Sequence, residues 1–148
     1  MLNQIDDDPL IQPSDGNWTI SAAALYLLRT LFKPHTKAQP VAEYLFPCCG
    51  HGLFEIKQQE DVLIMCNKGM DLEIRPLGEE VVIVAGDGRS HRVDASEWRK
   101  AVCGFADAVH AFYIASSPKR PSDTDEKGYK KFMSEWSRRR SLADSHDR

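Results

Sequence analysis

The chain has 148 residues, of which 42% are hydrophobic and 28% are charged, and its formal net charge is -3 at pH 7. This composition is typical of one globular domain in water, and no apolar run reaches the roughly 18 residues that a membrane span requires. It excludes an integral membrane protein. We expect one domain over residues 1–148, with a flexible arm at 1–16 and a flexible tail at 142–148.

The N-terminal sequence indicates a compartment. Asp6, Asp7 and Asp8 stand where a secretion signal would carry basic residues followed by an apolar core. We therefore expect a cytoplasmic protein, in which the four cysteines are free thiols unless they bind a metal.

Charge is distributed unevenly along the chain. Up to Glu97 there are 15 acidic and 8 basic residues, whereas from Trp98 onward there are 7 acidic and 11 basic residues. One explanation is that these charges lie on solvated surfaces and that their separation along the sequence disappears once the chain folds. The other is an acidic face that attracts a basic partner, because complementary potentials raise association rates.

The first predicted helix spans residues 22–32. Its sequence, AAALYLLRTLF, is rich in good helix formers, and Pro34 ends it because the residue before a proline resists the helical conformation. The next apolar segment, residues 41–46, can form a short helix or an edge strand. We favour one or two helical turns there.

The middle of the chain carries the pattern of a β-sheet. Five segments are strand-like: 53–58, 62–67, 70–74, 81–85 and 91–93. Short polar or glycine-containing links between them favour antiparallel neighbours. The continuous apolar runs at 62–65 and 81–84 indicate central strands that are largely covered. We predict an antiparallel meander of four or five strands.

The longest predicted helix follows, between Asp94 and Ser116. Five large side chains recur at spacings of three and four residues, which places them on one helix face: Trp98, Val102, Phe105, Val109 and Phe112. Asp94 can cap the first turn, and Pro118 ends the helix. We expect the whole stripe to be buried.

A polar connector at 117–128 leads to a last amphipathic helix in GYKKFMSEWSRRR, residues 128–140. Its basic end, Arg138–Arg140, could contact nucleic acid with Trp136 as a stacking platform. The acidic chain and the place of Trp136 in the apolar stripe favour a solvated helix end instead, so we predict no nucleic-acid partner. The fold class that follows is α+β: an antiparallel meander with one N-terminal helix and two C-terminal helices packed on it.

One cluster has residue types that suit a metal ion or a nucleophile: Cys48, Cys49 and His51, with Cys66 further along. Adjacent cysteines rarely bind the same zinc ion, and Cys66 lies in an apolar strand where a cysteine packs as a small hydrophobe. We therefore predict no catalytic residue, no metal and no cofactor. The alternative is a small cysteine- or zinc-dependent enzyme, or a metal-binding protein, that uses Cys48, Cys49 and His51.

Several segments resemble small cytosolic immunity proteins of bacterial polymorphic-toxin systems, which include contact-dependent inhibition, Rhs and type VI secretion modules. They are FPCCGHGLFEI, DVLIMCNKGMDLEI, EVVIV, EWRKAVCGFADAVHAFYIASSPK and GYKKFMSEWSRRR. In those proteins a sheet precedes a helix with a tryptophan, a valine and a Phe-Tyr pair, here Trp98, Val109, Phe112 and Tyr113. An aromatic helix follows, here with Gly128, Tyr129, Phe132, Glu135 and Trp136. The resemblance covers roughly residues 45–140.

This resemblance implies a protein without catalytic activity that binds a cognate toxin domain and blocks it. A basic nuclease is one candidate toxin, because the sheet half of the chain is rich in acids. On that hypothesis the binding residues are exposed acids near the strand turns: Glu60, Asp61, Asp71, Glu73, Glu79, Glu80 and Asp87. We expect no membrane partner, and a monomer or a homodimer.

Overall fold

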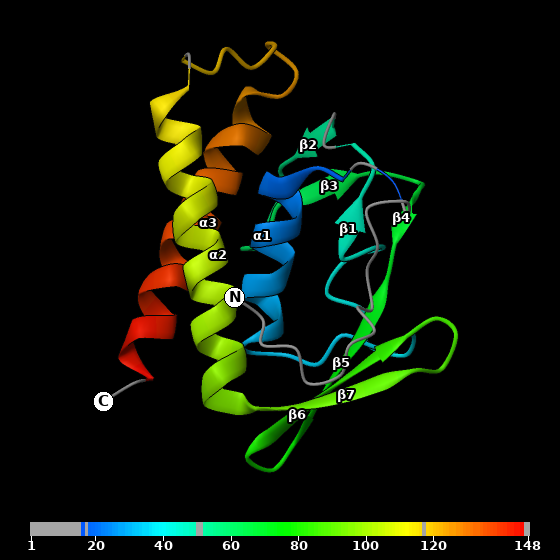
Figure 1. The fold of residues 1–148 in the computed structure, drawn as a ribbon. Coiled ribbons are helices and arrows are strands. Elements are labelled where there is room, and N and C mark those ends of the chain that lie inside the picture. Colours follow the sequence, from blue (N-terminus) through cyan, green and yellow to red (C-terminus); the bar gives the residue numbers. More distant parts are fainter. Residues whose placement is uncertain (1–15, 17, 50–51, 117, 147–148) are drawn as a thin grey trace.

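The computed structural model describes residues 16, 18–49, 52–116 and 118–146. Three stretches of these residues are helices: α1 (Ile20–Thr30), α2 (Ala95–Ala115) and α3 (Glu126–Ser145). Seven stretches of the same residues are strands: β1 (Phe46–Pro47), β2 (Gly52–Phe54), β3 (Leu63–Met65), β4 (Gly69–Met70), β5 (Leu72–Leu77), β6 (Glu80–Ala85) and β7 (Ser90–Asp94). The predicted α+β class, with one N-terminal and two C-terminal helices, is confirmed (Figure 1). The predicted arm lies outside the described residues, apart from Gly16.

The helix α1 lies between the other two helices and the strands, and it contacts α2, α3 and β1 (Figure 1). Because neighbours cover it on several sides, every residue from 22 to 30 is buried. Leu25 and Leu28 have no exposed surface at all. Each such side chain stabilises the fold by roughly 1.5 to 3 kcal/mol, which makes α1 the centre of the core.

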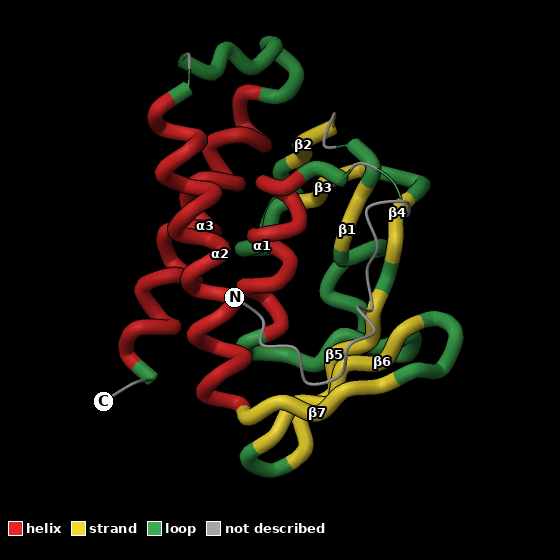
Figure 2. The backbone as a smooth tube through the Cα atoms, in the orientation of Figure 1, coloured by secondary structure: helices red, strands yellow, loops and turns green. Residues whose placement is uncertain are grey.

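The strands form three small antiparallel sheets in place of one meander. β1 pairs with β4, β2 pairs with β3, and β5, β6 and β7 form a three-stranded sheet in which β6 is central. The run at 81–84 is therefore central, as predicted. The run at 62–65 is not, because β3 pairs with β2 alone and leaves Leu63 and Met65 exposed. Figure 2 shows how short the strands outside the three-stranded sheet are.

Between α1 and β1, side chains make hydrogen bonds with backbone groups that a helix or a strand would otherwise pair. The Asp71 carboxylate, between β4 and β5, accepts from the Leu45 N–H at 3.0 Å, and Arg29 Nη1 donates to the Val41 carbonyl at 2.8 Å. Residues 41–45 are consequently irregular, so our preference for a short helix at 41–46 is wrong. Phe46 and Pro47 pair with β4, where a Cβ on Gly69 would lie 2.6 Å from the Phe46 carbonyl oxygen.

The helix α2 begins as predicted, because Asp94 accepts a hydrogen bond from the Ser96 N–H at 2.8 Å. Its stripe is only partly buried. Trp98, Val102 and Val109 are buried, but 37% of Phe105 and 66% of Phe112 are exposed. The prediction that the whole stripe is buried is therefore wrong, since α2 rests on α1 along one side and has its other side on the surface (Figure 1).

The helix α3 extends to Ser145, so residues 142–145 continue the helix where we expected a flexible tail. Ala143 is buried there, as are the predicted core residues Phe132 and Trp136. Near its start α3 packs on β2, where a Cβ added to Gly128 would overlap the Leu53 carbonyl. None of the helices in the described part of the chain has the length and apolar character needed to cross a membrane.

Candidate functional site

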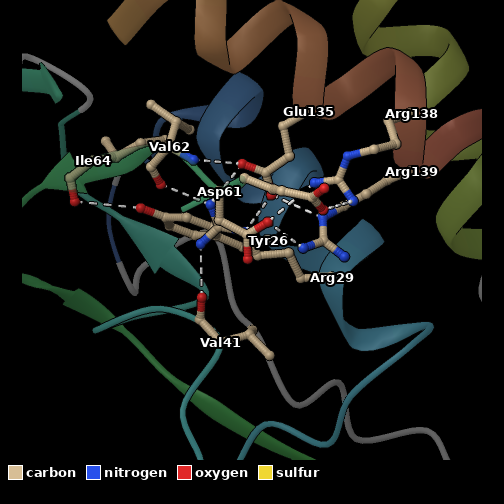
Figure 3. Close-up of polar contacts among 10 residues, drawn as sticks. Tyr26, Arg29, Val41, Asp61, Val62, Ile64, Glu135, Arg138 and Arg139 are labelled. Atoms are coloured by element: carbon tan, nitrogen blue, oxygen red, sulfur yellow. Dashed lines mark hydrogen bonds and ion pairs between the residues drawn. The ribbon is translucent and has the colours of Figure 1, made fainter. Parts of the chain in front are cut away.

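A buried ion network joins α1 to α3. Arg29 donates to both Glu135 carboxylate oxygens, with distances of 2.7 Å from Nε and 2.9 Å from Nη2 (Figure 3). Arg139, one turn further along α3, donates to Glu135 from Nε at 2.8 Å. The Glu135 side chain is fully buried, and 8% of the Arg29 side chain is exposed. Burial opposes the charge on Arg29, but the hydrogen bond to Glu135 and the attraction of the Glu135 and Asp61 charges together outweigh it and raise the pKa of the guanidinium.

The same network covers the edge of β3 that faces away from β2. Glu135 Oε2 accepts from the Val62 N–H, and Arg29 Nη2 donates to the Val62 carbonyl, both at 2.8 Å (Figure 3). The Tyr26 hydroxyl donates to the Ile64 carbonyl at 3.4 Å, and burial raises the pKa of that hydroxyl to about 12. Side chains thus make the hydrogen bonds that a neighbouring strand would make. The arrangement gives these polar groups a structural role.

Two of the predicted binding acids, Glu60 and Asp61, precede β3 and form ion pairs with α3. Asp61 Oδ1 lies 2.7 Å from Arg139 Nη2 and 3.2 Å from Arg138 Nη2, and Glu60 lies 3.3 Å from Arg138. Partial burial opposes ionisation of Asp61, but Arg139 and Arg29 outweigh that effect and lower the pKa of its carboxyl. The expected solvated basic helix end is wrong for Arg139, which is buried.

A third predicted acid, Asp71, holds the chain near α1. Its Oδ1 lies 2.9 Å from Nε2 of His35, a residue with 1% of its surface exposed. The His35 ring accepts from the Val41 N–H at Nδ1, so Nε2 carries the proton that it donates to Asp71. The Asp71 carboxylate therefore fixes the segment between α1 and β1.

The other four predicted acids belong to the three-stranded sheet. Glu73 and Glu80 lie on its outward face, Glu79 lies in the turn between β5 and β6, and Asp87 lies in the turn between β6 and β7. Both turns project from the body of the molecule (Figure 2). The left-handed φ of Gly78, 62°, lets the first turn be tight.

Along β6, buried residues alternate with more exposed ones, and the strand pairing extends the same two faces to β5 and β7. The outward face has half-buried Val82 and Val84 at its centre, opposite Arg75 and Glu73 of β5. Arg92 of β7 lies opposite Val82 and is 3.4 Å from Glu80, while Glu73 pairs with Arg75. The face thus has an apolar centre and a charged rim, which is the arrangement found in many protein interfaces.

Both turns carry acidic groups that solvent reaches. The Asp87 carboxylate accepts from the backbone N–H of Arg89 at 3.0 Å and from its Nε at 2.7 Å, and these hydrogen bonds lower the pKa of Asp87. Among the described residues, the Glu79 carboxylate makes no hydrogen bond or ion pair, and only its backbone carbonyl accepts, from Ala95. Glu79 therefore presents negative charge at one end of the sheet, whereas the charge of Asp87 at the other end is paired with Arg89.

A separate cluster of three thiols lies where the chain leaves β1 and β3. The sulfurs of Cys48 and Cys49 are each 3.4 Å from that of Cys66, and all three lie within 4.8 Å of one another. Cys66 is buried and Cys48 is exposed. Burial disfavours the thiolate of Cys66, but hydrogen bonds from the backbone at Lys68 and Cys49 and from the Cys49 and Cys48 side chains together lower its pKa to about 7. The hydrogen bond with Cys66 in turn raises the pKa of Cys48 to about 11. His51, the third residue of the predicted cluster, lies outside the described residues.

Sequence reasoning missed the buried network. Arg29 is the one charged residue in an otherwise apolar stretch, and Glu135 stands between Phe132 and Trp136 in an apolar stripe. Both positions are signals that a buried charge needs a partner. Their pairing has no local signature, since 106 positions separate them.

Comparison of the chain with protein-family models, with curated proteins and with solved structures finds no match in any of the three.

Proposed function

We propose that this chain belongs to the class of protein-binding inhibitors, which act by covering a partner and perform no chemistry. Within that class, we propose a cytoplasmic immunity protein that neutralises a cognate toxin domain, for which a basic nuclease is the leading candidate. The observation that carries the proposal is the outward face of β5–β6–β7. There Glu73, Glu79, Glu80 and Asp87 surround an apolar centre of valines.

The predicted acids differ in what they contact, and this difference favours the sheet as the binding face. Asp61 and Asp71 hold the fold together through hydrogen bonds to Arg139, His35 and the backbone. Of the acids of the sheet, Glu73, Glu80 and Asp87 pair with arginines that solvent reaches. Such surface pairs contribute only about 0 to 1 kcal/mol. They can therefore exchange an internal partner for an external one at little cost in stability.

The chemistry of such a partner follows from the face. Apolar side chains would cover Val82 and Val84, and lysines or arginines would approach Glu79, Glu80 and Asp87 at the two turns. Complementary charge mainly raises the association rate and narrows the choice of partner. A nuclease toxin suits this pattern because a surface that binds nucleic acid is basic.

The first test is affinity capture of the tagged chain, at moderate salt, from the cells that naturally produce it. A stoichiometric partner would then be expressed in a bacterial host with and without this chain. We expect the partner alone to arrest growth and co-expression to restore it. A stoichiometric partner whose toxicity the chain does not relieve would refute the immunity function.

The second test concerns the face. Replacing Glu79 and Glu80 by lysine should slow association with the captured partner and weaken the salt dependence of the rate. A matched control reverses two exposed acids outside the sheet, Glu43 and Glu55, for the same change in net charge. Equal rates for the Glu79/Glu80 variant and the wild type would remove this sheet as the binding face.

A second candidate function remains, a cysteine- or zinc-dependent enzyme or a metal-binding protein. The observation that favours it is the meeting of Cys48, Cys49 and Cys66. Among the described residues, no histidine or carboxylate joins this cluster. The cluster therefore supports metal binding better than a nucleophile paired with a base.

A further inference from the structure

We propose that Cys48, Cys49 and Cys66 form a binding site for one soft metal ion of the zinc or copper(I) class. This site goes beyond the proposed inhibitor function, and it lies outside the sheet that carries that function. The backbone holds the three sulfurs together, their spacing suits one ion, and three thiolates select a soft ion.

The backbone brings the cysteines together from two separate sheets. Cys48 and Cys49 directly follow β1, and Cys66 directly follows β3. The Cys48 N–H donates to the Lys68 carbonyl at 3.0 Å, which holds the two loops side by side. The chain bends at Cys48, where the strand ends. Neighbouring side chains that would point to opposite faces within a strand can therefore both reach Cys66.

The sulfur spacing fits a single ion. Zinc–sulfur bonds are about 2.3 Å long, so two sulfurs on one ion stand at most about 4.6 Å apart. Here two of the three distances are 3.4 Å and the third is no greater than 4.8 Å. A shift of a few tenths of an ångström in flexible side chains would complete the geometry. The cysteines are free thiols, so no disulfide competes for these sulfurs.

The donor set selects the class of ion. Thiolates are soft ligands that favour zinc and copper(I), whereas magnesium and calcium require oxygen ligands. Copper(I) is commonly satisfied by three thiolates, and zinc would complete its tetrahedron with a water molecule. Cys48 is exposed, so an ion can enter from solvent without opening the core. In the metal-free chain the Cys66 S–H donates to the Lys68 carbonyl at 2.9 Å, and a bound ion would take the place of that proton.

A bound ion would have a structural consequence. It would tie the β1–β4 pair to the β2–β3 hairpin, which form separate sheets. Because the unfolded chain does not hold the three cysteines together, binding energy would add to folding energy. The thermal midpoint should therefore rise with the concentration of the ion.

The experiment uses the full chain, without a histidine tag, stripped of metal by chelation and kept reduced. Zn²⁺ and Cu⁺ are added in separate titrations, and metal content is measured after dialysis. We expect one ion per chain and a higher thermal midpoint for at least one of the two. Three of the four thiols should then become protected from alkylation. Addition of Co²⁺ should give the absorption bands of a cobalt–thiolate bond.

Variants identify the ligands. Cys49→Ser should weaken binding by more than about 100-fold, because it removes one of three ligands. Cys66→Ser tests the third ligand, but Cys66 is buried and this variant can fail to fold. Cys48→Ser, at an exposed position, then provides the same test. Cys103→Ser is the matched control, since Cys103 is a half-buried free thiol on α2 outside the cluster. Failure of both ions to bind at one per chain, or an equal loss in Cys103→Ser, would overturn the proposal. So would a disulfide between Cys49 and Cys66 that forms in air, if the reduced chain takes up no metal.

Discussion

Charged side chains serve two different purposes in two regions of the molecule. Where α1, α3 and β3 meet, Arg29, Glu135 and Arg139 are buried and hydrogen-bonded to one another and to the backbone (Figure 3). On the sheet β5–β6–β7, acids such as Glu80 and Asp87 form ion pairs but remain exposed to solvent. The first region uses charge to complete the fold. The second keeps charge available at the surface.

The difference teaches that an ion pair is informative about function only together with its burial. A buried charge that loses its partner costs about 3 to 5 kcal/mol, because the remaining charge stays out of water. An exposed pair contributes about 0 to 1 kcal/mol, because water replaces either partner. Substitutions in the first region should therefore change stability. Those in the second should change association.

The largest effect is expected for Glu135→Ala. It leaves Arg29 buried without its carboxylate and removes the acceptor of the Val62 N–H. We expect a loss of about 3 to 5 kcal/mol in the free energy of unfolding, measured by urea denaturation.

The control for this variant is Glu126→Ala, which removes an exposed carboxylate of the same helix that pairs with Lys130. That change should cost far less, because solvent reaches both partners of the pair. Similar losses for the two variants would contradict the structural role of the buried network.

A smaller effect is expected for Gly128→Ala, which tests how closely the start of α3 approaches β2. An added Cβ would overlap the Leu53 carbonyl, so α3 must move away from β2 at a cost of about 1 to 3 kcal/mol. Gly104→Ala in α2 is a control for which we expect the opposite change in the free energy of unfolding. Nothing lies within 4 Å of its added Cβ, and alanine should stabilise the helix by roughly 0.5 to 1 kcal/mol. A stabilised Gly128→Ala would exclude the close contact.

Acid should weaken the ion pairs that Asp61 makes with α3, because the folded-state pKa of Asp61 is lowered below the usual 3.8. A lowered pKa contributes stability above the pKa of the unfolded chain, and this stability is lost as pH falls through the lower, folded value. The wild type should therefore be more stable than Asp61→Asn at neutral pH, and the difference should shrink below about pH 4. Urea titrations across this range measure it, with Asp123→Asn as the exposed control. A difference that is independent of pH would assign the effect to packing.

The helices could be predicted from the sequence because their signals are local. The run at 22–32 and the cap at Asp94 depend on neighbouring residues, and α1 and α2 begin within two residues of the expected positions. Burial was less predictable. Phe105 and Phe112 have the same spacing as the buried valines of α2, yet 37% and 66% of their surfaces are exposed.

The division of the strands into three sheets could not be predicted, because distant side chains cause it. Arg29 and Glu135 occupy the β3 edge, and Asp71 takes a backbone N–H beside β1. The meeting of Cys48 with Cys66 is equally non-local, with 18 positions between them. The spacing of the adjacent cysteines argued against a shared ion. The bend that follows β1 lets both sulfurs reach Cys66, and residue spacing does not reveal that bend.

The smallest effect on stability is expected where the proposed function requires the largest effect on binding. Glu79 lies in an exposed turn, and Glu80 is 3.4 Å from Arg92 in an exposed pair. Replacing both by lysine should therefore change the free energy of unfolding by less than about 0.5 to 1 kcal/mol, measured by urea denaturation. A loss comparable to that of Glu135→Ala would mean that these acids also hold the fold together. Slower association in a variant of unchanged stability can come only from the surface itself, so this pair of measurements separates binding charge from folding charge.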